Sequence, residues 1–273
     1  MPPFAKYRSL MAAGGGFLGG FGIGSLVPDN LRVLVGAGER QSESAPSWQW
    51  ERNWDKLEPA AQAPSAESGA AKGDRKKARA VNHVILVRHG QYNTRGKSDA
   101  DKSLTDLGRL QAEVTGMRLA ELDLPYTSIV KSTMTRAQQT SALIEAQLPG
   151  VPVSSDPLLV EGFPVAPDPP LGHVNKPDRV AHQDGPRIEA AFRKYVHRAE
   201  PHEHEDRYSV LVCHANVIRY FVCRALQFPP QAWLRLSLNH ASITWISVTP
   251  SGRVILRCYG ETGHMLPQWI SSK

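Results

Sequence analysis

The chain contains 273 residues, enough for one large domain with an appendage. Its formal net charge is +6, and 41% of its residues are hydrophobic, an ordinary value for a globular protein. The basic excess is scattered, with no long Lys/Arg run beside interleaved aromatics, so it favours anionic substrates or acidic membrane surfaces over nucleic acid. The three cysteines form no CxxC pair, which argues against a disulfide framework or a zinc site.

The N-terminal segment has the features of a membrane anchor. Residues 10–27 carry no charged side chain, and a bilayer span needs roughly 20 apolar residues. Gly15 and Gly19 have the spacing that lets two membrane helices approach closely. The preceding residues, 1–9, are basic and lack acidic side chains, which fits mitochondrial targeting. We expect a transmembrane anchor over residues 10–27; the alternatives are a flexible Gly-rich tail and a cleaved secretory signal.

The next segment, residues 28–80, is predicted to be a linker that contains a cluster of tryptophans. Three of the six tryptophans lie within residues 48–55, in a region otherwise poor in residues that form a core. Large aromatic side chains flanked by linkers cannot bury themselves locally, so we expect them to dock on the catalytic domain or on another copy of the chain. An interaction or self-assembly motif is the favoured interpretation, and a patch packed on its own domain is the alternative.

Residues 81–273 are predicted to form a catalytic domain of the α/β class. Apolar runs and helical periodicity alternate along this part of the chain. This alternation indicates a three-layer α/β/α sandwich with a mostly parallel sheet, in which ligands bind beyond the carboxyl ends of the strands. The expected strands are 83–88, 128–131, 208–213, 242–248 and 253–259, and the expected helices are 105–122, 135–148, 187–199 and 216–226.

Two histidines follow apolar runs, and charged residues between them suggest a phosphate site. His89 ends the run that begins at residue 83, and His214 ends the run that begins at residue 210. Neutral imidazole is nucleophilic near pH 7 and can attack phosphorus directly. Arginine clamps phosphate oxygens in a bidentate way that lysine cannot match. The candidate residues are Arg88, His89, Gly90, Arg136, Glu161 and His214.

Each candidate residue has a different predicted role in phosphoryl transfer. Gly90 leaves room for a phosphate to approach the backbone, and the helix after His214 can add its N-terminal amides. Glu161 is the candidate acid for the leaving alkoxide and the candidate base for the water that follows. No metal or cofactor is required. Taken singly, each residue has an ordinary alternative: a buried core histidine, a surface arginine or a loop carboxylate.

The same residues stand in motifs that resemble the phosphoglycerate mutase branch of the histidine phosphatase superfamily. Arg88-His89-Gly90 resembles the signature of that superfamily, and the similarity extends over residues 82–260. It implies that His89 accepts the phosphoryl group, that Arg88, Arg136 and His214 bind phosphate, and that Glu161 donates the proton. The resemblance assigns no role to Asn93 or Arg95. The further matching segments are 104–112, 132–140 and 213–216.

Further segments are similar to a membrane-anchored mitochondrial group within this branch, which dephosphorylates serine and threonine on proteins. They include residues 187–193, 214–220 and 223–238. The tryptophan segment resembles the motif that drives multimerisation and activation in that group, and the matching residues are Trp50, Asn53, Trp54 and Asp55. The resemblance implies phosphorylated protein substrates, a homo-oligomer held by this motif with a contribution from the Gly-rich anchor, and residence in a mitochondrial membrane.

Three functions remain open at the level of the sequence. The stretch between Glu161 and His214 is rich in proline and contains no Arg-Arg pair. Sugar-phosphate mutases that resemble this family carry a longer insertion at this place, and that insertion contains such a pair. A short cap implies an open pocket that suits a phosphorylated loop of a protein. A small-molecule phosphomonoesterase of the mutase type is the alternative enzyme, and a membrane scaffold with secondary catalysis is the alternative outside that class.

Overall fold

The computed structural model describes residues 49–57, 80–170, 172, 177–200 and 202–272. The predicted anchor, residues 10–27, and most of the predicted linker lie outside these ranges. Within the described ranges, none of the helices combines the length and the apolar character needed to cross a bilayer.

The described domain is built on one six-stranded mixed sheet. Its strands lie in the order β3-β2-β4-β1-β5-β6. The first four pair in parallel, whereas β5 pairs antiparallel with β1 and with β6. The sheet therefore has a parallel half and an antiparallel hairpin at one edge. The strands are β1 (Asn82–Arg88), β2 (Tyr126–Lys131), β3 (Val153–Ser155), β4 (Arg207–Cys213), β5 (Ile243–Val248) and β6 (Val254–Glu261).

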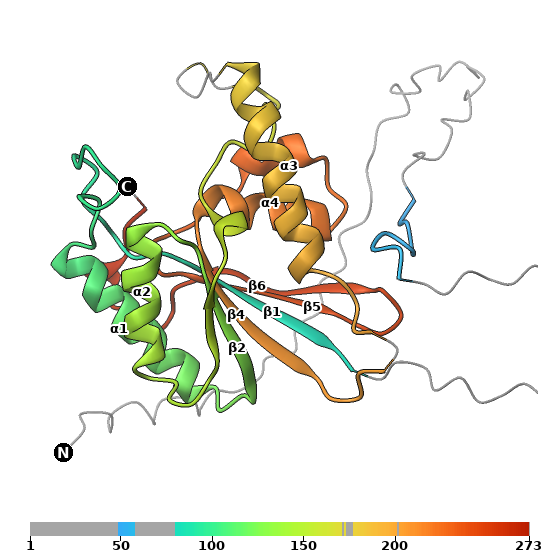
Figure 1. Cartoon of the computed structure of the whole chain (residues 1–273), viewed down its shortest axis with the longest axis horizontal. Coiled ribbons are helices and arrows are strands. Elements are labelled where there is room, and N and C mark those ends of the chain that lie inside the picture. Colours follow the sequence, from blue (N-terminus) through green and yellow to red (C-terminus); the bar gives the residue numbers. More distant parts are fainter. Residues whose placement is uncertain (1–48, 58–79, 171, 173–176, 201, 273) are drawn as a thin grey trace, which may run out of the picture. The chain divides into compact units, whose positions relative to one another are not determined.

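Helices cover both faces of the sheet because its central strands are apolar on both sides. On one face, Ile85 and Val87 of β1 belong to a core shared with α1 (Asp106–Glu121) and α2 (Thr135–Glu145). On the other face, Val84 and Leu86 belong to a core shared with α3 (Asp178–Tyr195) and α4 (Ala215–Ala225). Figure 1 shows these two helix pairs on opposite sides of the strands. The predicted three-layer α/β/α arrangement is thus present.

The parallel half of the sheet brings distant parts of the chain to one edge. Strands β1 and β4 are neighbours, and Arg88 at the end of β1 pairs with Cys213 at the end of β4. The amide of His89 donates to the carbonyl of Cys213 at 3.0 Å. Since the carboxyl ends of parallel strands meet at the same edge, His89 and His214 leave the sheet side by side.

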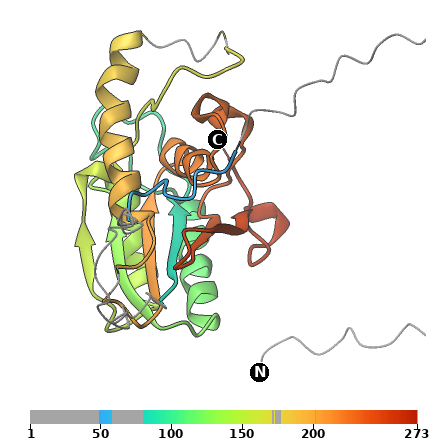
Figure 2. The same ribbon diagram turned by 90° about the vertical axis from the view of Figure 1, so that its right-hand side faces the viewer.

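The structure differs from the predicted elements at two places. Strand β3 is an exposed three-residue edge strand, too short to show a hydrophobic pattern in the sequence. Helix α3 begins at Asp178, nine residues before the predicted start, and contains Pro186 in its interior. Residues 178–186 are mostly polar and carry few apolar side chains, so helical periodicity does not reveal the first half of the helix. The first half of α3 rises beyond the ends of the strands, as Figure 2 shows.

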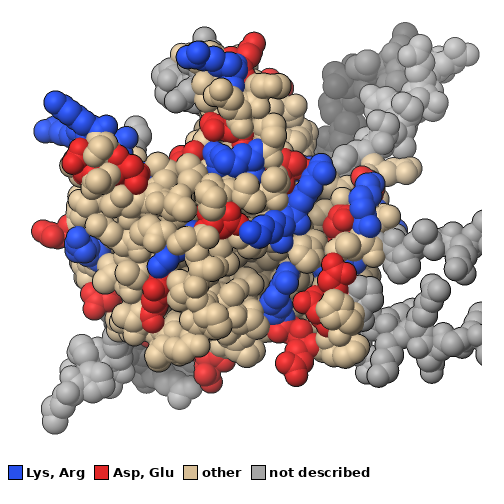
Figure 3. Space-filling view, viewed as in Figure 1, with Lys and Arg blue, Asp and Glu red and all other residues tan. Residues whose placement is uncertain are grey.

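Charge is distributed over the domain surface without a dominant sign. On the face drawn in Figure 3, Lys and Arg side chains alternate with Asp and Glu, and no continuous basic band is visible. This distribution agrees with the scattered charge of the sequence. A basic stripe of the kind that tracks a nucleic-acid backbone is therefore not present on that face.

Candidate active site

The centre of the site is a pair of buried histidines. His89 and His214 are 2% and 0% exposed, and their ring centroids lie 5.2 Å apart. His89 follows β1, and His214 immediately precedes α4. Tyr92 and His240 complete the aromatic surroundings of His89, at centroid distances of 5.0 and 5.7 Å.

The backbone fixes the tautomer of His89. Its Nδ1 lies 2.8 Å from the carbonyl oxygen of Gly90. A carbonyl oxygen only accepts hydrogen bonds, so in the neutral ring Nδ1 carries the proton and Nε2 keeps a lone pair. The amide of Gly90 donates to Thr140 Oγ1 at 3.0 Å, which holds this turn against α2. His89 is therefore oriented with its nucleophilic nitrogen opposite the backbone contact.

Gly90 has a packing role as well as the predicted role in phosphate approach. A Cβ atom at this position would lie 2.4 Å from the carbonyl oxygen of Gly108, at the start of α1. Any side chain would push the turn that carries His89 away from α1. Glycine is therefore required for the close approach of two backbones next to the nucleophile.

The two predicted arginines lie beside the histidines, in different settings. Arg136, in the first turn of α2, places its guanidinium 4.7 Å from the ring centre of Tyr92 and 3.7 Å from Asp99 Oδ1. Arg88 donates from Nη1 to the Leu238 carbonyl at 2.5 Å, and its Nη2 lies 3.1 Å from His240 Nε2. Both side chains are buried, so their charges act in a medium of low dielectric constant.

Three donors of this cluster have no protein partner among the described residues. They are Arg88 Nε, Arg136 Nε and His214 Nδ1, and all three are buried. The other nitrogen of His214, Nε2, lies 2.8 Å from Ser132 Oγ, which already accepts from the Met134 amide at 3.4 Å. With the Ser132 hydroxyl donating to Nε2, the neutral ring carries its proton on Nδ1. An unpaired buried donor costs about 1–3 kcal/mol, more when it is charged. Unpaired donors on the three side chains predicted to bind phosphate indicate a site made for an anion.

Burial and charge both keep the histidines neutral. Burial lowers the pKa of His89 well below its ordinary value, and the charges of His214, Arg136 and Arg88 lower it further. Burial lowers the pKa of His214 in the same way, again helped by the two arginines. The electrostatic setting therefore keeps both imidazoles in the neutral form, which retains a nucleophilic lone pair, near neutral pH.

Glu161 lies in the loop before α3, and its carboxylate contacts the first turn of α4. Its Oε1 accepts from its neighbour Gly162 at 3.1 Å, and its Oε2 accepts from the amide of Asn216 at 3.4 Å. Burial raises the pKa of Glu161 above its ordinary value, although these amides and the charges of Arg136 and Arg88 act in the opposite direction. A carboxyl group with a raised pKa is suited to carry a proton to a leaving group.

Arg187 holds the loop that carries Glu161, and the sequence did not single out this residue. From α3 it donates to the carbonyls of Leu158 and Val160 at 2.9 and 2.5 Å, and to that of Glu161 at 3.3 Å. Asp184, one turn earlier, accepts from the amide of Phe163 at 2.9 Å. Because the predicted helix began at residue 187, the sequence did not show that Asp184 and Arg187 lie on the same helical turn near Glu161.

A second set of contacts that the sequence did not indicate holds Arg88. The carbonyl of Ser272 accepts from Arg88 Nη1 at 3.2 Å and from Nη2 at 3.3 Å. Ser271 contacts His240 twice: its carbonyl accepts from the amide at 2.7 Å, and its hydroxyl lies 2.9 Å from Nδ1. Burial and the charge of Arg88 lower the pKa of His240 to about 3, so it remains a neutral acceptor. No sequence motif signals such carbonyl contacts.

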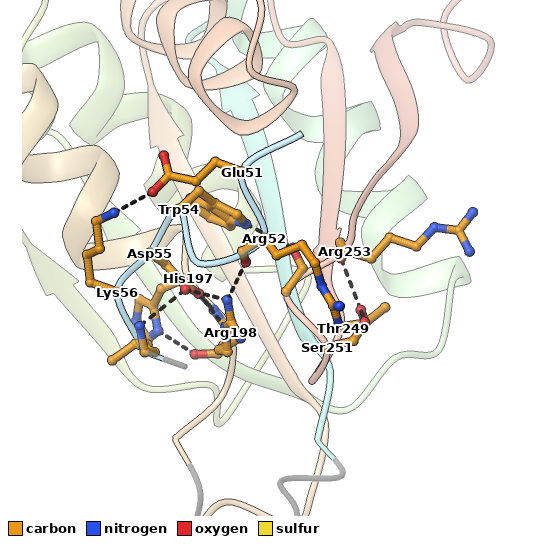
Figure 4. Close-up of polar contacts among 12 residues, drawn as sticks. Glu51, Arg52, Trp54, Asp55, Lys56, His197, Arg198, Thr249, Ser251 and Arg253 are labelled. Carbon is orange, nitrogen blue, oxygen red and sulfur yellow. Dashed lines mark hydrogen bonds and ion pairs between the residues drawn. The ribbon is translucent and has the colours of Figure 1, made fainter. Parts of the chain in front are cut away.

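The tryptophan segment lies against the catalytic domain of its own chain. Figure 4 shows residues 51–56 against Arg198 and the β5–β6 hairpin. Trp54 Nε1 donates to the carbonyl of Gly252 at 2.8 Å, and the Trp54 ring packs 5.8 Å from that of Phe192. The described part of the segment thus occupies one of the two predicted docking places, the catalytic domain.

A buried ion pair fixes the segment to the domain. Asp55 and Arg198 are almost fully buried, and Asp55 Oδ1 lies 2.7 Å from Arg198 Nη2. Asp55 Oδ2 also accepts from the Arg198 backbone amide and from its Nε, each at 2.9 Å. Burial by itself would raise the pKa of Asp55, but the hydrogen bonds and charge of Arg198 hold that pKa below its ordinary value. The carboxylate is therefore charged at neutral pH.

Comparisons with known proteins agree with this geometry. The family described as "Histidine phosphatase superfamily (branch 1)" matches residues 84–164 and 175–260. A Bacillus stearothermophilus protein of known structure, YhfR, superposes with a TM-score of 0.53 at 21% identity, over 67% of this chain and 98% of that chain. At that level of identity the likeness concerns the fold.

Relatives of known name are much closer in sequence. The mitochondrial serine/threonine-protein phosphatase PGAM5 of Xenopus laevis is 51% identical over 82% of this chain and 84% of its own. The protein of the same name from Homo sapiens is 52% identical over 81% of this chain and 80% of its own. The protein of the same name from Drosophila melanogaster is 44% identical over 82% of this chain and 81% of its own. With the family match over more than half of its length, the chain belongs to the histidine phosphatase superfamily, branch 1.

Proposed function

We propose that the chain is a mitochondrial serine/threonine-protein phosphatase that works through a phosphohistidine on His89. Arg88, Arg136, His214 and the backbone at Gly90 bind the phosphoryl group, and Glu161 donates the proton. The observation that carries the proposal is the neutral, backbone-oriented His89 beside three buried donors without partners. A nucleophile and an anion site are thus combined in one cluster.

In the first step, His89 takes over the phosphoryl group. A bond forms between His89 Nε2 and phosphorus, and the bond from phosphorus to the serine or threonine oxygen breaks. The proton of Glu161 passes to that oxygen, because a free alkoxide is a poor leaving group. The arginines and His214 neutralise the charge that spreads over the three other phosphoryl oxygens.

In the second step, water releases the phosphate. The Glu161 carboxylate removes a proton from a water molecule, whose oxygen forms a bond to phosphorus while the bond to Nε2 breaks. Inorganic phosphate leaves, His89 returns to its neutral form and Glu161 is protonated again. The same carboxyl group therefore serves as acid and then as base.

The substrate class is supported by two independent observations. The relatives at 44–52% identity are named serine/threonine-protein phosphatases. The stretch between Glu161 and His214 has no Arg-Arg pair of the kind that would hold the carboxylate of a sugar acid. A phosphorylated protein segment is therefore favoured over a small phosphorylated metabolite.

The same relatives support a mitochondrial location, since their names state it. Residues 10–27 then serve as a single-pass membrane anchor after a basic N-terminus, residues 1–9. The motif formed by Trp50, Asn53, Trp54 and Asp55 assembles several copies and thereby activates the enzyme. Extraction of mitochondrial membranes with alkaline carbonate tests the anchor: the full chain stays in the pellet, and a chain lacking residues 1–27 is released.

Rapid quench with a phosphoserine peptide labelled in its phosphate tests the mechanism. The expected result is an acid-labile label on His89 during turnover. The variant His89→Ala carries no label and hydrolyses no peptide, while its circular dichroism stays unchanged. His204→Ala, which removes an exposed loop histidine, is the matched control and retains both label and turnover.

Two outcomes would overturn the proposal. Turnover retained by His89→Ala would remove the nucleophile. Faster hydrolysis of phosphoglycerates than of phosphoserine and phosphothreonine peptides would replace the protein substrate by a small one.

A further inference from the structure

A groove adjoins the catalytic cluster and is lined in part by Val180 and Asp184 of α3. It has a volume of about 480 Å³, and Arg136 and Glu161 of the catalytic cluster are among its lining residues. Ligand pockets in proteins usually have about 300–1,000 Å³, so the groove has room for a large side chain beyond the phosphate. Because it shares two residues with the phosphate site, the group that fills it must be attached close to the phosphorylated atom.

The remaining walls of the groove are mainly apolar. Met134, Val180 and Leu234 are partly exposed and line it. Phe163 and Trp233 form its floor, packed edge to face with ring centroids 5.6 Å apart. The polar atom of Trp233 is used elsewhere, since Nε1 donates to the Val165 carbonyl at 2.9 Å.

The polar residues of the groove outside the catalytic cluster are already paired. Asp184 accepts from the amide of Phe163 at 2.9 Å and from Arg187 at 3.3 Å, which compensates its charge. Asn216 donates to the carbonyl of Gly162 at 2.9 Å and accepts from Arg219 at 3.3 Å. A polar or charged occupant would lose its water without gaining these partners, whereas an apolar occupant loses nothing.

We infer that this groove binds a large apolar side chain of the substrate, such as leucine, methionine or phenylalanine, next to the phosphorylated serine or threonine. Consecutive Cα atoms are about 3.8 Å apart, so the side chain belongs to a residue one or two positions away. The inference rests on the proposed protein phosphatase activity and gives it a sequence preference. The phosphate end recognises the modification, and the groove recognises its neighbour.

Phosphopeptides that differ at one position test this inference. A parent phosphoserine peptide with serine at every flanking position is compared with peptides that carry leucine or aspartate at −2, −1, +1 or +2. We expect leucine to raise kcat/KM at least tenfold over serine at one of these positions, and aspartate not to raise it, because hydrophobic pockets discriminate by about 10–200-fold.

Variants of the groove identify its side chains as the cause. Val180→Thr keeps the shape of the side chain and replaces one methyl group by a hydroxyl. Leu234→Asn replaces a branched apolar group by a polar one of similar size. Both are expected to reduce the preference for leucine to less than threefold while turnover of the serine-flanked parent stays within twofold. Val153→Ser, on the exposed edge strand β3, is the matched control and keeps the preference.

The outcomes separate this inference from the proposed function. Hydrolysis of all peptides at equal rates would overturn the groove assignment and leave the phosphatase intact. A leucine preference that survives in both Val180→Thr and Leu234→Asn would also overturn it. Failure to hydrolyse any phosphopeptide, with phosphoglycerates turned over, would overturn the protein phosphatase activity itself and the groove assignment with it.

Discussion

At the residue scale, the reactivity of His89 follows from what surrounds its ring. Burial lowers its pKa well below the ordinary value, and the nearby positive charges act in the same direction. A histidine with a lowered pKa is neutral above that pKa and loses its nucleophilic lone pair only below it. We therefore expect the acid limb of the activity profile to lie below the ordinary histidine pKa.

Glu161 is predicted to determine the alkaline limb of the pH profile of kcat/KM. Burial raises its pKa, so it keeps its proton to a higher pH than an exposed glutamate, and the acid form is lost above that pKa. For phosphoserine peptides, kcat/KM should fall as the pH rises through this pKa. Glu161→Gln should remove this limb and lower the rate by about 10²–10⁴-fold, the usual contribution of a general acid. Profiles of kcat/KM against pH for both proteins measure this.

The leaving group provides the control for Glu161. p-Nitrophenolate leaves without a proton, and its release in the first turnover reports the first step alone. In Glu161→Gln this release should therefore slow less than a tenth as much as release of the dephosphorylated peptide in the first turnover, although the later hydrolysis step is slowed with both substrates. An equal slowing of the first step with both substrates would contradict a role in proton donation.

Arg187 is predicted to act through Glu161 by positioning its loop. The guanidinium binds the carbonyls on both sides of the acid, so Arg187→Met should displace the carboxyl group without removing it. A displacement of about 1 Å can cost roughly a hundredfold in rate. We expect kcat for phosphoserine peptides to fall about 10–100-fold with KM nearly unchanged, and the first-turnover release of p-nitrophenolate from p-nitrophenyl phosphate to slow much less.

Arg193→Met is the matched control for Arg187→Met. Arg193 also lies on α3 and also pairs with a carboxylate of the same helix, Glu189, but it is exposed. Its replacement should leave kcat within twofold. Equal slowing of the first turnover with the two substrates in Arg187→Met would indicate general destabilisation of the fold and contradict the positioning role.

At the scale of elements, the final described residues act as a strap behind the catalytic cluster. Besides Arg88 and His240, they bind Gln111 of α1, which donates to the Trp269 carbonyl at 2.6 Å and to Ser271 Oγ at 2.9 Å. Gln111 in turn accepts from the amide of Gln91 at 2.9 Å, close to the nucleophile. The strap therefore connects the guanidinium of Arg88 with the turn after His89.

Deletion of residues 271–273 is predicted to weaken phosphate binding. Arg88 loses the Ser272 carbonyl, and His240 loses both of its contacts with Ser271, so the guanidinium is no longer held in one orientation. We expect the Kd for vanadate, a phosphate analogue, to rise about tenfold, measured by isothermal titration calorimetry. Ser272→Ala keeps the carbonyl that accepts from Arg88 and should not change the Kd. Unchanged vanadate affinity in the deletion would contradict the role of the strap.

Elements also show how far the sequence determines the site. The histidines were predicted to lie together because long apolar runs identify β1 and β4, and parallel strands end at one edge. Arg187 and the strap were not predicted, because they act through backbone carbonyls, which every residue possesses. The start of α3 was wrongly placed because residues 178–186 are mostly polar, so they lack the apolar periodicity that identifies the second half of the helix.

At the scale of the whole molecule, the tryptophan segment connects the linker to the catalytic domain. Gly252 has a φ of 81°, and a Cβ atom there would lie 2.5 Å from Arg198 Nη2. The hairpin between β5 and β6 is thus shaped to receive both Trp54 and the guanidinium that binds Asp55. The surface on the domain is specific for this segment, whether the segment comes from the same copy or from another.

Trp54→Ala is predicted to lower assembly size and turnover together. The substitution removes the hydrogen bond to Gly252 and the packing on Phe192. Truncation of a fully buried tryptophan costs about 3–5 kcal/mol, and the loss at the partly buried Trp54 is smaller. Analytical ultracentrifugation and phosphopeptide hydrolysis measure the two effects on the same sample. Lys56→Ala is the matched control, since its pair with Glu51 is exposed and such pairs contribute about 0–1 kcal/mol. Unchanged sedimentation of Trp54→Ala would defeat the assembly role.

A mixing experiment distinguishes docking within one copy from docking between copies. Trp54→Ala leaves an intact domain surface, whereas Arg198→Ala leaves an intact tryptophan segment and removes the partner of Asp55. Each variant alone should have low turnover, because loss of one partner of a buried ion pair costs about 3–5 kcal/mol. If the segment of one copy binds the domain of the next, the mixture should recover a substantial part of the wild-type turnover. Turnover equal to the sum of the separate variants would show that each segment serves only its own domain.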